Sequence, residues 1–369
     1  MKVLTIVGAR PQFIKASALS RQIKATKKTH IDEVIIHTGQ HFDLNMSDIF
    51  FDELGIPKPD YNLEISGLDH GAMTGQMIEG IERILKIELP DVVVVYGDTN
   101  STLSGALAAS KLHIPIAHIE SGLRSHNMYM PEEINRIVTD RLSSLLFCPS
   151  LLAMDNLKSE GFPFDNVNSV RQSLVLSGDI MYDVVKNFES MFDNEAYLMD
   201  LGLSRKNYIL ITAHRQETTD DPGRLESLLD DIERLSGLYN IVMPVHPRTK
   251  KLISGKKLDE KLNKVTLLDP TGYMEMQGLI KNSNLVITDS GGLQKEAYFH
   301  HVPCITIRNE TEWPETVDLG WNTLCPIGSG SLLEIIPTIK SPSSSEVNPY
   351  GDGASARVIV DKLCELFGR

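Results

Sequence analysis

The chain has 369 residues, which suits two domains of about 100–200 residues each better than one. Its 41% hydrophobic and 23% charged residues are ordinary for a globular protein with a sizeable core. The formal net charge of −13 argues against a general affinity for nucleic acid or for an anionic membrane. No apolar run approaches the roughly 18 residues of a membrane span, and the four cysteines lie far apart without metal-ligand spacing. We therefore expect a cytoplasmic protein with reduced cysteines, no metal site and no membrane partner.

The N-terminus predicts a strand at 3–7, followed by the turn GARP and a helix. Arg10 and Lys15 flank the start of that helix, where the helix N-terminus already favours anions. These two cations mark a candidate phosphate site, although a solvated surface pair would have the same spacing. The turn is not GxGxxG, so nothing here predicts NAD, and we expect no cofactor.

Three carboxylates lie at the ends of predicted elements in the first half. The apolar runs 92–96 and 115–119 are typical of buried parallel strands, and they are followed by Asp98 and Glu120. Glu132 follows near the start of an amphipathic helix. Because open α/β sheets bind ligands at the carboxyl ends of their strands, these acids indicate a site that moves protons. The structural alternatives are a helix N-cap for Asp98 and a helix-dipole role for Glu132.

Strands and helices alternate at short spacing along the whole chain, which predicts a doubly wound α/β fold. The composition becomes polar and rich in turn residues at 161–172, where we place the hinge. We therefore expect a first domain at 1–170 and a second at 171–353, which begins with a strand at 174–177. A last helix is expected within 354–369.

The segment DSGG follows a predicted strand in the second half and opens a helix. The first amides of this helix would point at an anion, and Gly291 and Gly292 after Ser290 would let a phosphate approach the backbone closely. Glu296 lies about one and a half turns into the helix, within reach of a ribose diol. Strand–Gly–Gly–helix turns are also frequent without a ligand, so this signal alone is weak.

Two His–Arg sets follow neighbouring predicted strands, one beginning at His214 and the other at His246. A lone histidine after a strand is more often structural than catalytic. Two such sets at one sheet edge favour a function, and they suit a diphosphate that needs charge-assisted donors.

Eight segments, taken together and in order, resemble the non-hydrolysing UDP-N-acetylglucosamine 2-epimerases. They are GARPQFIK from Gly8, GDTNST from Gly97, HIESGLRS from His118, MPEEINR from Met130, TAHRQE from Thr212, HPRT from His246, TDSGGLQKEA from Thr288 and NPYGDG from Asn348.

The resemblance implies the glycosyltransferase-B fold, two Rossmann-like domains with an active-site cleft between them and a last helix that packs back on the first. It also implies a homodimer and a redox-neutral reaction that supplies precursors of cell-surface polysaccharides. Such enzymes eliminate UDP across C1–C2 to give a 2-acetamidoglucal, and then add UDP back with C2 protonated on the opposite face.

The matching positions imply the site residues. The catalytic set is Asp98, Glu120, Glu132 and His214, and the UDP-binding set is Arg10, Lys15, His214, Met276, Ser290, Gly291, Gly292 and Glu296. Supporting or sugar-side positions are Gln40, His41, Arg136, Arg215 and His246.

The chain departs from the family pattern at several positions. Trp313 replaces an arginine in a TERPE segment, Met276 and Thr271 replace residues that flank the uridine, and Asp43 replaces a glutamine of the regulatory site. The segments GARPQFIKAS, HTGQHFDLNMSDIFF and TEWPE are more similar to the subgroup that epimerises UDP-2,3-diacetamido-glucuronic acid. Both that sugar and UDP-N-acetylglucosamine remain candidate substrates, and a glycosyltransferase or a non-catalytic binding module of the same fold remains an alternative.

Overall fold

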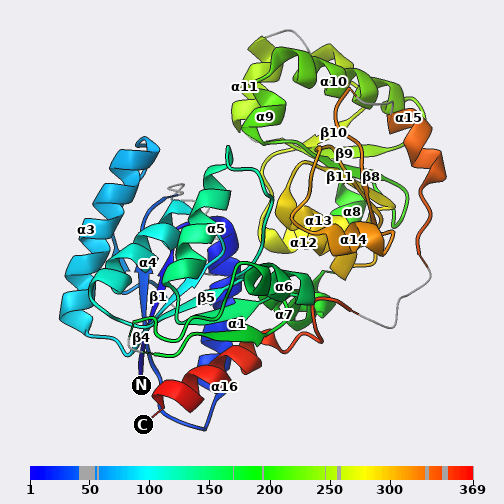
Figure 1. The fold of residues 1–369 in the computed structure, drawn as a ribbon. Coiled ribbons are helices and arrows are strands. Elements are labelled where there is room, and N and C mark those ends of the chain that lie inside the picture. The colour runs from blue at the N-terminus through cyan, green and yellow to red at the C-terminus, as the bar shows by residue number, and fades with distance from the viewer. Residues whose placement is uncertain are drawn as a thin grey trace. The chain divides into compact units, whose positions relative to one another are not determined.

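The computed structural model describes residues 1–40, 55, 58–168, 170–192, 195–245, 247–255, 259–328, 332–342 and 348–368 (Figure 1). Three positions from the sequence analysis, His41, Asp43 and His246, lie outside the described residues. The chain divides into two compact units, the first comprising Met1–Asn187 and Asn348–Arg369 and the second Phe188–Val347. Within the described part, no helix is long and apolar enough to cross a membrane.

A parallel sheet of seven strands, in the order β3-β2-β1-β4-β5-β6-β7, forms the centre of the first unit. The central strands are buried along their whole length, as expected for a parallel sheet covered by helices on both faces. The strand order reverses between β1 and β4, which is where doubly wound sheets place their ligands. The strands are β1 (Lys2–Val7), β2 (Asp32–His37), β3 (Tyr61–Asn62), β4 (Val92–Tyr96), β5 (Ile116–Ile119), β6 (Leu145–Cys148) and β7 (Ser173–Leu176).

Helices follow most of these strands and bury one apolar face each. Met77, Ile81, Ile84 and Leu85 of α3, for example, form one face of a helix and pack into the core of the unit. The last helix, α16, packs against α1, the first helix, although the two lie at opposite ends of the chain (Figure 1). The helices are α1 (Arg10–Ala25), α3 (His70–Glu88), α4 (Asn100–Lys111), α5 (Pro131–Leu142), α6 (Leu151–Ser159), α7 (Ile180–Phe188) and α16 (Ser355–Phe367).

The expected strand at 174–177 forms, as β7, but it does not begin the second unit. It pairs in parallel with β6, from Leu145 opposite Ser173 to Cys148 opposite Leu176. The polar stretch 161–172 is therefore a connection inside the first sheet, where Gln172 donates to the carbonyl of Ser143 at 2.7 Å. The boundary between the units lies at 187/188 instead. β7 is the last strand of the first sheet, and the chain leaves the first unit only after α7.

The chain leaves the first unit after α7 and returns to it just before α16, and these two segments are bonded together. The carboxylate of Asp183 on α7 accepts from the backbone N–H groups of Ser355 and Ala356 at 2.9 and 2.7 Å. The ammonium of Lys186 donates to the carbonyl of Asp352 at 2.8 Å. Asp183 thus satisfies two of the N–H groups that the start of α16 leaves unpaired.

The second unit has a parallel sheet of six strands, in the order β10-β9-β8-β11-β12-β13. Residues of β8 alternate between two cores, because Ile209 and Ile211 pack on one face of the sheet and Leu210 on the other. The strands are β8 (Ile209–Thr212), β9 (Ile241–Pro244), β10 (Thr266–Leu268), β11 (Leu285–Thr288), β12 (Cys304–Thr306) and β13 (Asn322–Leu324).

The helices of the second unit are shorter on average, and the longest, α10, opens with Asp221 as an N-cap whose carboxylate accepts from Gly223 and Arg224. Both units are doubly wound α/β domains, as expected. The helices are α8 (Glu195–Asp200), α9 (Gln216–Thr219), α10 (Pro222–Ser236), α11 (Pro247–Gly255), α12 (Tyr273–Asn282), α13 (Gly291–Phe299), α14 (Pro314–Asp318) and α15 (Leu332–Ile335), with 3₁₀ turns η1 (Glu189–Met191), η2 (Asp259–Leu262) and η3 (Ile336–Thr338).

Candidate active site

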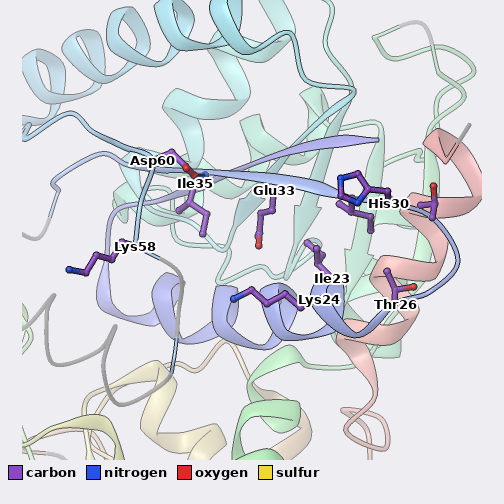
Figure 2. Close-up of a pocket in the computed structure, with 10 residues that line it drawn as sticks. Ile23, Lys24, Thr26, His30, Glu33, Ile35, Lys58 and Asp60 are labelled. Atoms are coloured by element: carbon purple, nitrogen blue, oxygen red, sulfur yellow. Dashed lines mark hydrogen bonds between the residues drawn. The ribbon is translucent and has the colours of Figure 1, made fainter.

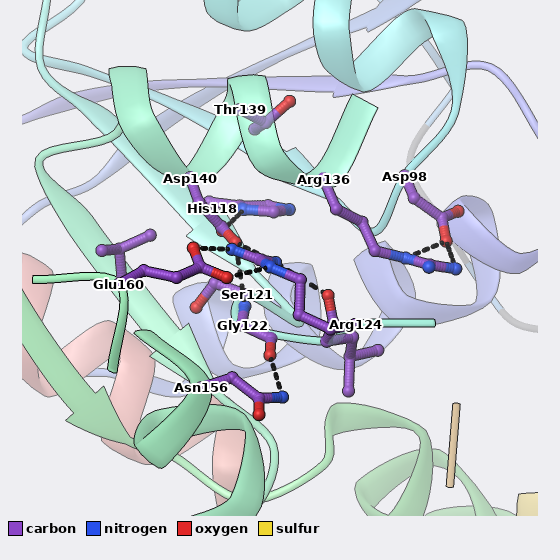
Figure 3. Close-up of polar contacts among 12 residues, drawn as sticks. Asp98, His118, Ser121, Gly122, Arg124, Arg136, Thr139, Asp140, Asn156 and Glu160 are labelled. Atoms are coloured by element: carbon purple, nitrogen blue, oxygen red, sulfur yellow. Dashed lines mark hydrogen bonds and ion pairs between the residues drawn. The ribbon is translucent and has the colours of Figure 1, made fainter. Parts of the chain in front are cut away.

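Asp98 lies in the turn between β4 and α4 and is held by Arg136 of α5 (Figure 3). Two guanidinium nitrogens of Arg136, Nε and Nη2, donate to Oδ2 of Asp98 at 2.9 and 2.7 Å. The Arg136 side chain is 4% exposed and that of Asp98 is 29% exposed. The carboxylate therefore faces solvent while a buried cation fixes its orientation, and Arg136 is a supporting residue of Asp98.

Glu120 follows β5 and forms an ion pair with Lys15 of α1. Both side chains are nearly buried, at 9% and 8% exposure. The backbone of Glu120 has φ +71°, a left-handed conformation that non-glycine residues rarely adopt. A Cβ at Gly97 would lie 3.2 Å from Oε2 of Glu120 and 3.5 Å from Nζ of Lys15, so a side chain there would crowd the pair. Lys15 thus contacts a catalytic candidate, and it lies on the same helix as Arg10, the first residue of α1 and the other cation of the predicted phosphate site.

Glu132 and Glu133 both lie in the first turn of α5, but only Glu132 is exposed. Glu133 accepts from the backbone N–H groups of Ser125 and His126 at 3.0 and 2.9 Å, and from Arg136 at 2.7 Å. Burial raises the pKa of Glu133, but these hydrogen bonds outweigh it and lower the pKa below its usual range. Glu133 therefore has a structural role at the start of α5, next to Glu132, for which the sequence analysis gave such a role as the alternative.

Amide side chains tie the neighbouring turns together. The expected residue Gln40 accepts from the N–H and hydroxyl of Ser101, at the start of α4, at 3.0 and 2.7 Å. Gln12, which sequence reasoning missed, accepts from the N–H of Gly8 at 2.8 Å and donates to the carbonyl of Tyr96 at 2.8 Å. It links the turns after β1 and β4, and its signal in the sequence is a glutamine directly before the apolar pair Phe13 and Ile14.

A buried histidine network was also missed (Figure 3). His118 of β5 contacts Asp140 of α5 and the carbonyl of Gly97, each at 2.7 Å. Arg124 contacts the other oxygen of Asp140 at 2.8 Å and forms a two-point ion pair with Glu160. The only signal in the sequence is a histidine inside an apolar strand, because its partners lie far along the chain.

In the second unit, the turn after β8 carries His214 and Arg215, and Asp289 fixes it from the end of β11. The fully buried carboxylate of Asp289 accepts from the backbone N–H groups of both residues at 3.0 Å. The ring of His214 is half exposed, and its Nδ1 lies 3.4 Å from Oδ1 of Asp289. The imidazole therefore faces solvent with its backbone anchored.

The N-terminus of α13 lies beside this turn in the sheet. Ser290 is its N-cap, and Gly291 begins the helix. A Cβ on Gly291 would lie 3.3 Å from Oε2 of Glu312, 3.9 Å from Nη2 of Arg215 and 3.9 Å from Nε1 of Trp313. The helix amides, the guanidinium and the indole N–H suit an anion, and the Glu312 carboxylate beside them is itself paired with Arg308 at 2.9 and 3.0 Å.

The remaining expected residues of this unit lie near that helix. Glu296 is nearly buried on α13, and Met276 of α12 is partly buried and packs against a core cluster. The ammonium of Lys295 lies over the ring of Trp313, 3.8 Å from the ring centroid. A cation therefore lies beside the residue that stands in place of the family arginine.

A cavity of about 450 Å³ lies elsewhere, toward the amino end of β2 (Figure 2). Glu33 and Ile35 of β2 line it, together with Lys24 near the end of α1. This end of the strand is opposite to the one that carries the candidate residues, so the cavity is separate from the site. Among the described residues, no group of three or more His, Cys, Asp or Glu side chains is placed to hold a metal ion.

The model of the family described as UDP-N-acetylglucosamine 2-epimerase matches residues 23–364. The chain belongs to this family. A relative from Pseudomonas aeruginosa named UDP-2,3-diacetamido-2,3-dideoxy-D-glucuronate 2-epimerase is 49% identical over 369 residues, covering 99% of this chain and 100% of that protein. A UDP-N-acetylglucosamine 2-epimerase from Methanocaldococcus jannaschii is 42% identical, covering 98% of each chain.

Solved structures of family members agree with the fold described above. The Methanocaldococcus jannaschii enzyme in complex with UDP-GlcNAc and UDP has a TM-score of 0.89 at 41% identity, covering 99% of this chain and 100% of that one. The Neisseria meningitidis enzyme bound to UDP-GlcNAc has a TM-score of 0.87 at 29% identity, with the same coverage. The expected family and its architecture of two Rossmann-like domains are confirmed.

Proposed function

We propose that this protein is an isomerase that reversibly epimerises C2 of a UDP-2-acetamido sugar. The reaction eliminates UDP to form a 2-acetamidoglucal and adds UDP back, with a proton delivered to the opposite face of C2. The observation that carries the proposal is the pair of turns after β4 and β5, which present Asp98 and Glu120 on buried cations, in a chain that belongs to the epimerase family.

The carboxylates suit the acid–base part of this reaction. The hydrogen on C2 is not acidic, because no ketone lies beside it, so its removal needs a positioned base and its return needs a positioned acid. We assign these roles to Asp98, Glu120 and the exposed Glu132. Arg136 and Lys15 support Asp98 and Glu120 by holding the carboxylates in place.

The second unit suits the leaving group. Elimination develops negative charge on the departing diphosphate, and preorganised donors stabilise that charge best. We assign this role to His214, Arg215 and the start of α13 at Ser290, Gly291 and Gly292. Glu296, Met276 and Arg10 complete the proposed contacts to UDP.

Two sugars are candidates. The 49%-identical relative is named for the diacetamido-glucuronate, and the 42%-identical relative for UDP-N-acetylglucosamine. We propose the diacetamido-glucuronate derivative as the first to test, since the greater identity accompanies that name.

The experiment incubates the pure protein with each UDP-sugar in deuterated water and follows C2 by NMR. We expect deuterium at C2 and formation of the C2 epimer with at least one of the sugars. Glu120→Gln is the matched control and should abolish exchange while retaining UDP binding. Lack of exchange with both sugars would refute the proposed function, and exchange with one alone would identify the substrate.

The homodimer and the cytoplasmic location expected from the sequence remain predictions. Light scattering of the pure protein measures the first, and fractionation of producing cells measures the second.

A further inference from the structure

His118 is completely buried on β5, two residues before Glu120, and Figure 3 shows its ring against Asp140 of α5. Nδ1 lies 2.7 Å from Oδ1 of Asp140, and Nε2 lies 2.7 Å from the carbonyl oxygen of Gly97. Both distances are typical of strong hydrogen bonds. The ring therefore connects α5 with the turn that carries Asp98.

The identity of the acceptors determines where the hydrogens lie. A carbonyl oxygen only accepts, so Nε2 donates to Gly97. Burial raises the pKa of the Asp140 carboxyl, but the bonds and charges of His118 and Arg124 outweigh it and lower the pKa. Asp140 is thus a carboxylate that also only accepts, and Nδ1 donates to it.

The groups around the ring balance its charge. Asp140 comes from α5, Arg124 follows β5, and Glu160 is the C-cap of α6, where it forms a two-point ion pair with Arg124. Cys148 of β6 is uncharged, because burial raises the pKa of its thiol to about 12. The Arg124 guanidinium and the carboxylates of Asp140 and Glu160 sum to one negative charge around the ring, with Glu160 35% exposed.

The bonds of this network fix the backbone on both sides of Glu120. His118 holds the carbonyl of Gly97, while the N–H of Gly97 donates to Ile119 at 3.0 Å. The second oxygen of Asp140 accepts from the N–H of Gly122 at 3.2 Å. Glu120 itself has φ +71°, a strained conformation that persists only where its surroundings determine it.

We propose that His118, carrying a hydrogen on each ring nitrogen, is a positioning residue that sets the Gly97–Asp98 peptide and the left-handed backbone of Glu120 for catalysis. Because its ring is fully buried, it acts through these two residues rather than on the substrate. The inference rests on the proposed function for its catalytic consequence, and on the hydrogen-bond geometry and the ionised Asp140 for the state of the ring.

The first test is NMR of the wild-type protein labelled with ¹⁵N-histidine at neutral pH, with His118→Gln identifying the His118 signals. We expect a directly bonded hydrogen on both ring nitrogens of His118. A ring with one bare nitrogen overturns the proposal. This readout needs no substrate, so it stands even if neither sugar exchanges deuterium and the proposed function fails.

The second test compares two substitutions that each keep one donor. The amide nitrogen of Gln takes the place of Nε2 and donates toward Gly97, whereas that of Asn takes the place of Nδ1 and donates toward Asp140. We expect kcat to fall on the order of 100-fold in His118→Asn, because misplacement by about 1 Å has that effect, and to fall less in His118→Gln. KM, and UDP affinity measured by calorimetry, should stay near the wild-type values in both.

Thermal unfolding of both variants separates positioning from a merely structural role. A structural role makes the loss of turnover follow the loss of folded protein, with no preference for Gln over Asn after correction, and that result overturns the proposal. If His118→Asn does not fold, His118→Gln alone tests the proposal. Retention of most of the turnover with UDP affinity intact supports positioning. A decrease of kcat as large as about 100-fold overturns it.

Discussion

The ion pair between Lys15 and Glu120 joins two nearly buried side chains. Removal of one partner of such a pair leaves an uncompensated buried charge and costs about 3–5 kcal/mol. Replacement of both partners by uncharged groups of similar shape costs much less. Lys15 is therefore expected to affect stability as well as the proposed chemistry.

Lys15→Met should lower the free energy of unfolding by about 3–5 kcal/mol, measured by urea denaturation. The double variant Lys15→Met/Glu120→Gln should recover a large part of this loss, since the charge left by the single substitution is gone. If the double variant were as unstable as Lys15→Met, the ion pair would not be the origin of the effect.

Glu33 on β2 is a partly buried acid that lines the cavity of Figure 2. Burial raises its pKa above the usual 4.5, although Thr5 donates a hydrogen bond to it at 3.0 Å. The folded protein therefore holds this proton to a higher pH than the unfolded chain does. Stability from this group decreases as pH rises from the unfolded pKa through the folded one, and the loss persists above both.

Glu33→Gln should consequently raise the melting temperature at neutral pH, because the amide removes the buried charge and its oxygen still accepts from Thr5. The gain should vanish in acid, below the unfolded pKa of glutamate. Asp32→Asn on the same strand, where the side chain is 59% exposed, is the control and should change little. A melting temperature of Glu33→Gln that is unchanged at neutral pH would contradict the assignment.

At the scale of the element, α5 organises the candidate carboxylates. Glu132, Arg136 and Asp140 are spaced by four residues, which places them on one face of the helix. The first is a proposed acid or base, the second holds Asp98, and the third holds His118 and Gly122. A rotation or shift of this one helix would move Glu132 and the side chains that position Asp98 and the backbone beside Glu120. All three proposed carboxylates would therefore be displaced together.

The strands of this site and the acids that follow them could be predicted from the sequence, because apolar runs and turn residues are patterns within short stretches of chain. The apolar runs of β4 and β5 determined where Asp98 and Glu120 lie in the sheet. The ion pairs of these acids could not be predicted. Lys15 and Glu120, for example, come together only when β1, β4 and β5 assemble into one sheet. The hinge was misplaced for a related reason: a polar connection such as 161–172 has the same composition whether the next strand joins the old sheet or a new one.

The start of α13 provides a prediction for the second unit. Gly291→Ala puts a methyl group 3.3 Å from Oε2 of Glu312, in the space that a phosphate needs beside the helix amides. UDP affinity should fall about tenfold, or about 1.4 kcal/mol, by calorimetry. The helix preference of Ala stabilises the variant and the tight contact with Glu312 opposes it, so thermal unfolding is measured beside UDP affinity.

Gly75→Ala is the matched control, because Gly75 lies within α3 and a Cβ there meets nothing within 4 Å. It should raise stability by about 0.5–1 kcal/mol and leave UDP affinity unchanged. Equal UDP affinities of the wild type and Gly291→Ala would remove the start of α13 from the proposed binding site.

At the scale of the whole molecule, the two units have separate cores, so a ligand of one unit should stabilise that unit first. Saturating UDP at about 100 times its Kd stabilises the bound form by about 2.7 kcal/mol. Hydrogen exchange should slow most in β8, β11 and α13 of the second unit. Protection that is greatest in β4 and β5 instead would place UDP on the first unit and reverse the proposed division of roles.

The bonding of α7 to the segment before α16 has a consequence for the order in which the molecule is made. The second unit is inserted within the sequence of the first, so all of its residues leave the ribosome before those of α16. Until then, the surface of α1 that packs against α16 in the finished unit is not covered by that helix. The first unit is therefore completed only after the second, and a nascent chain stopped at 347 carries all of the second unit and a first unit that lacks α16.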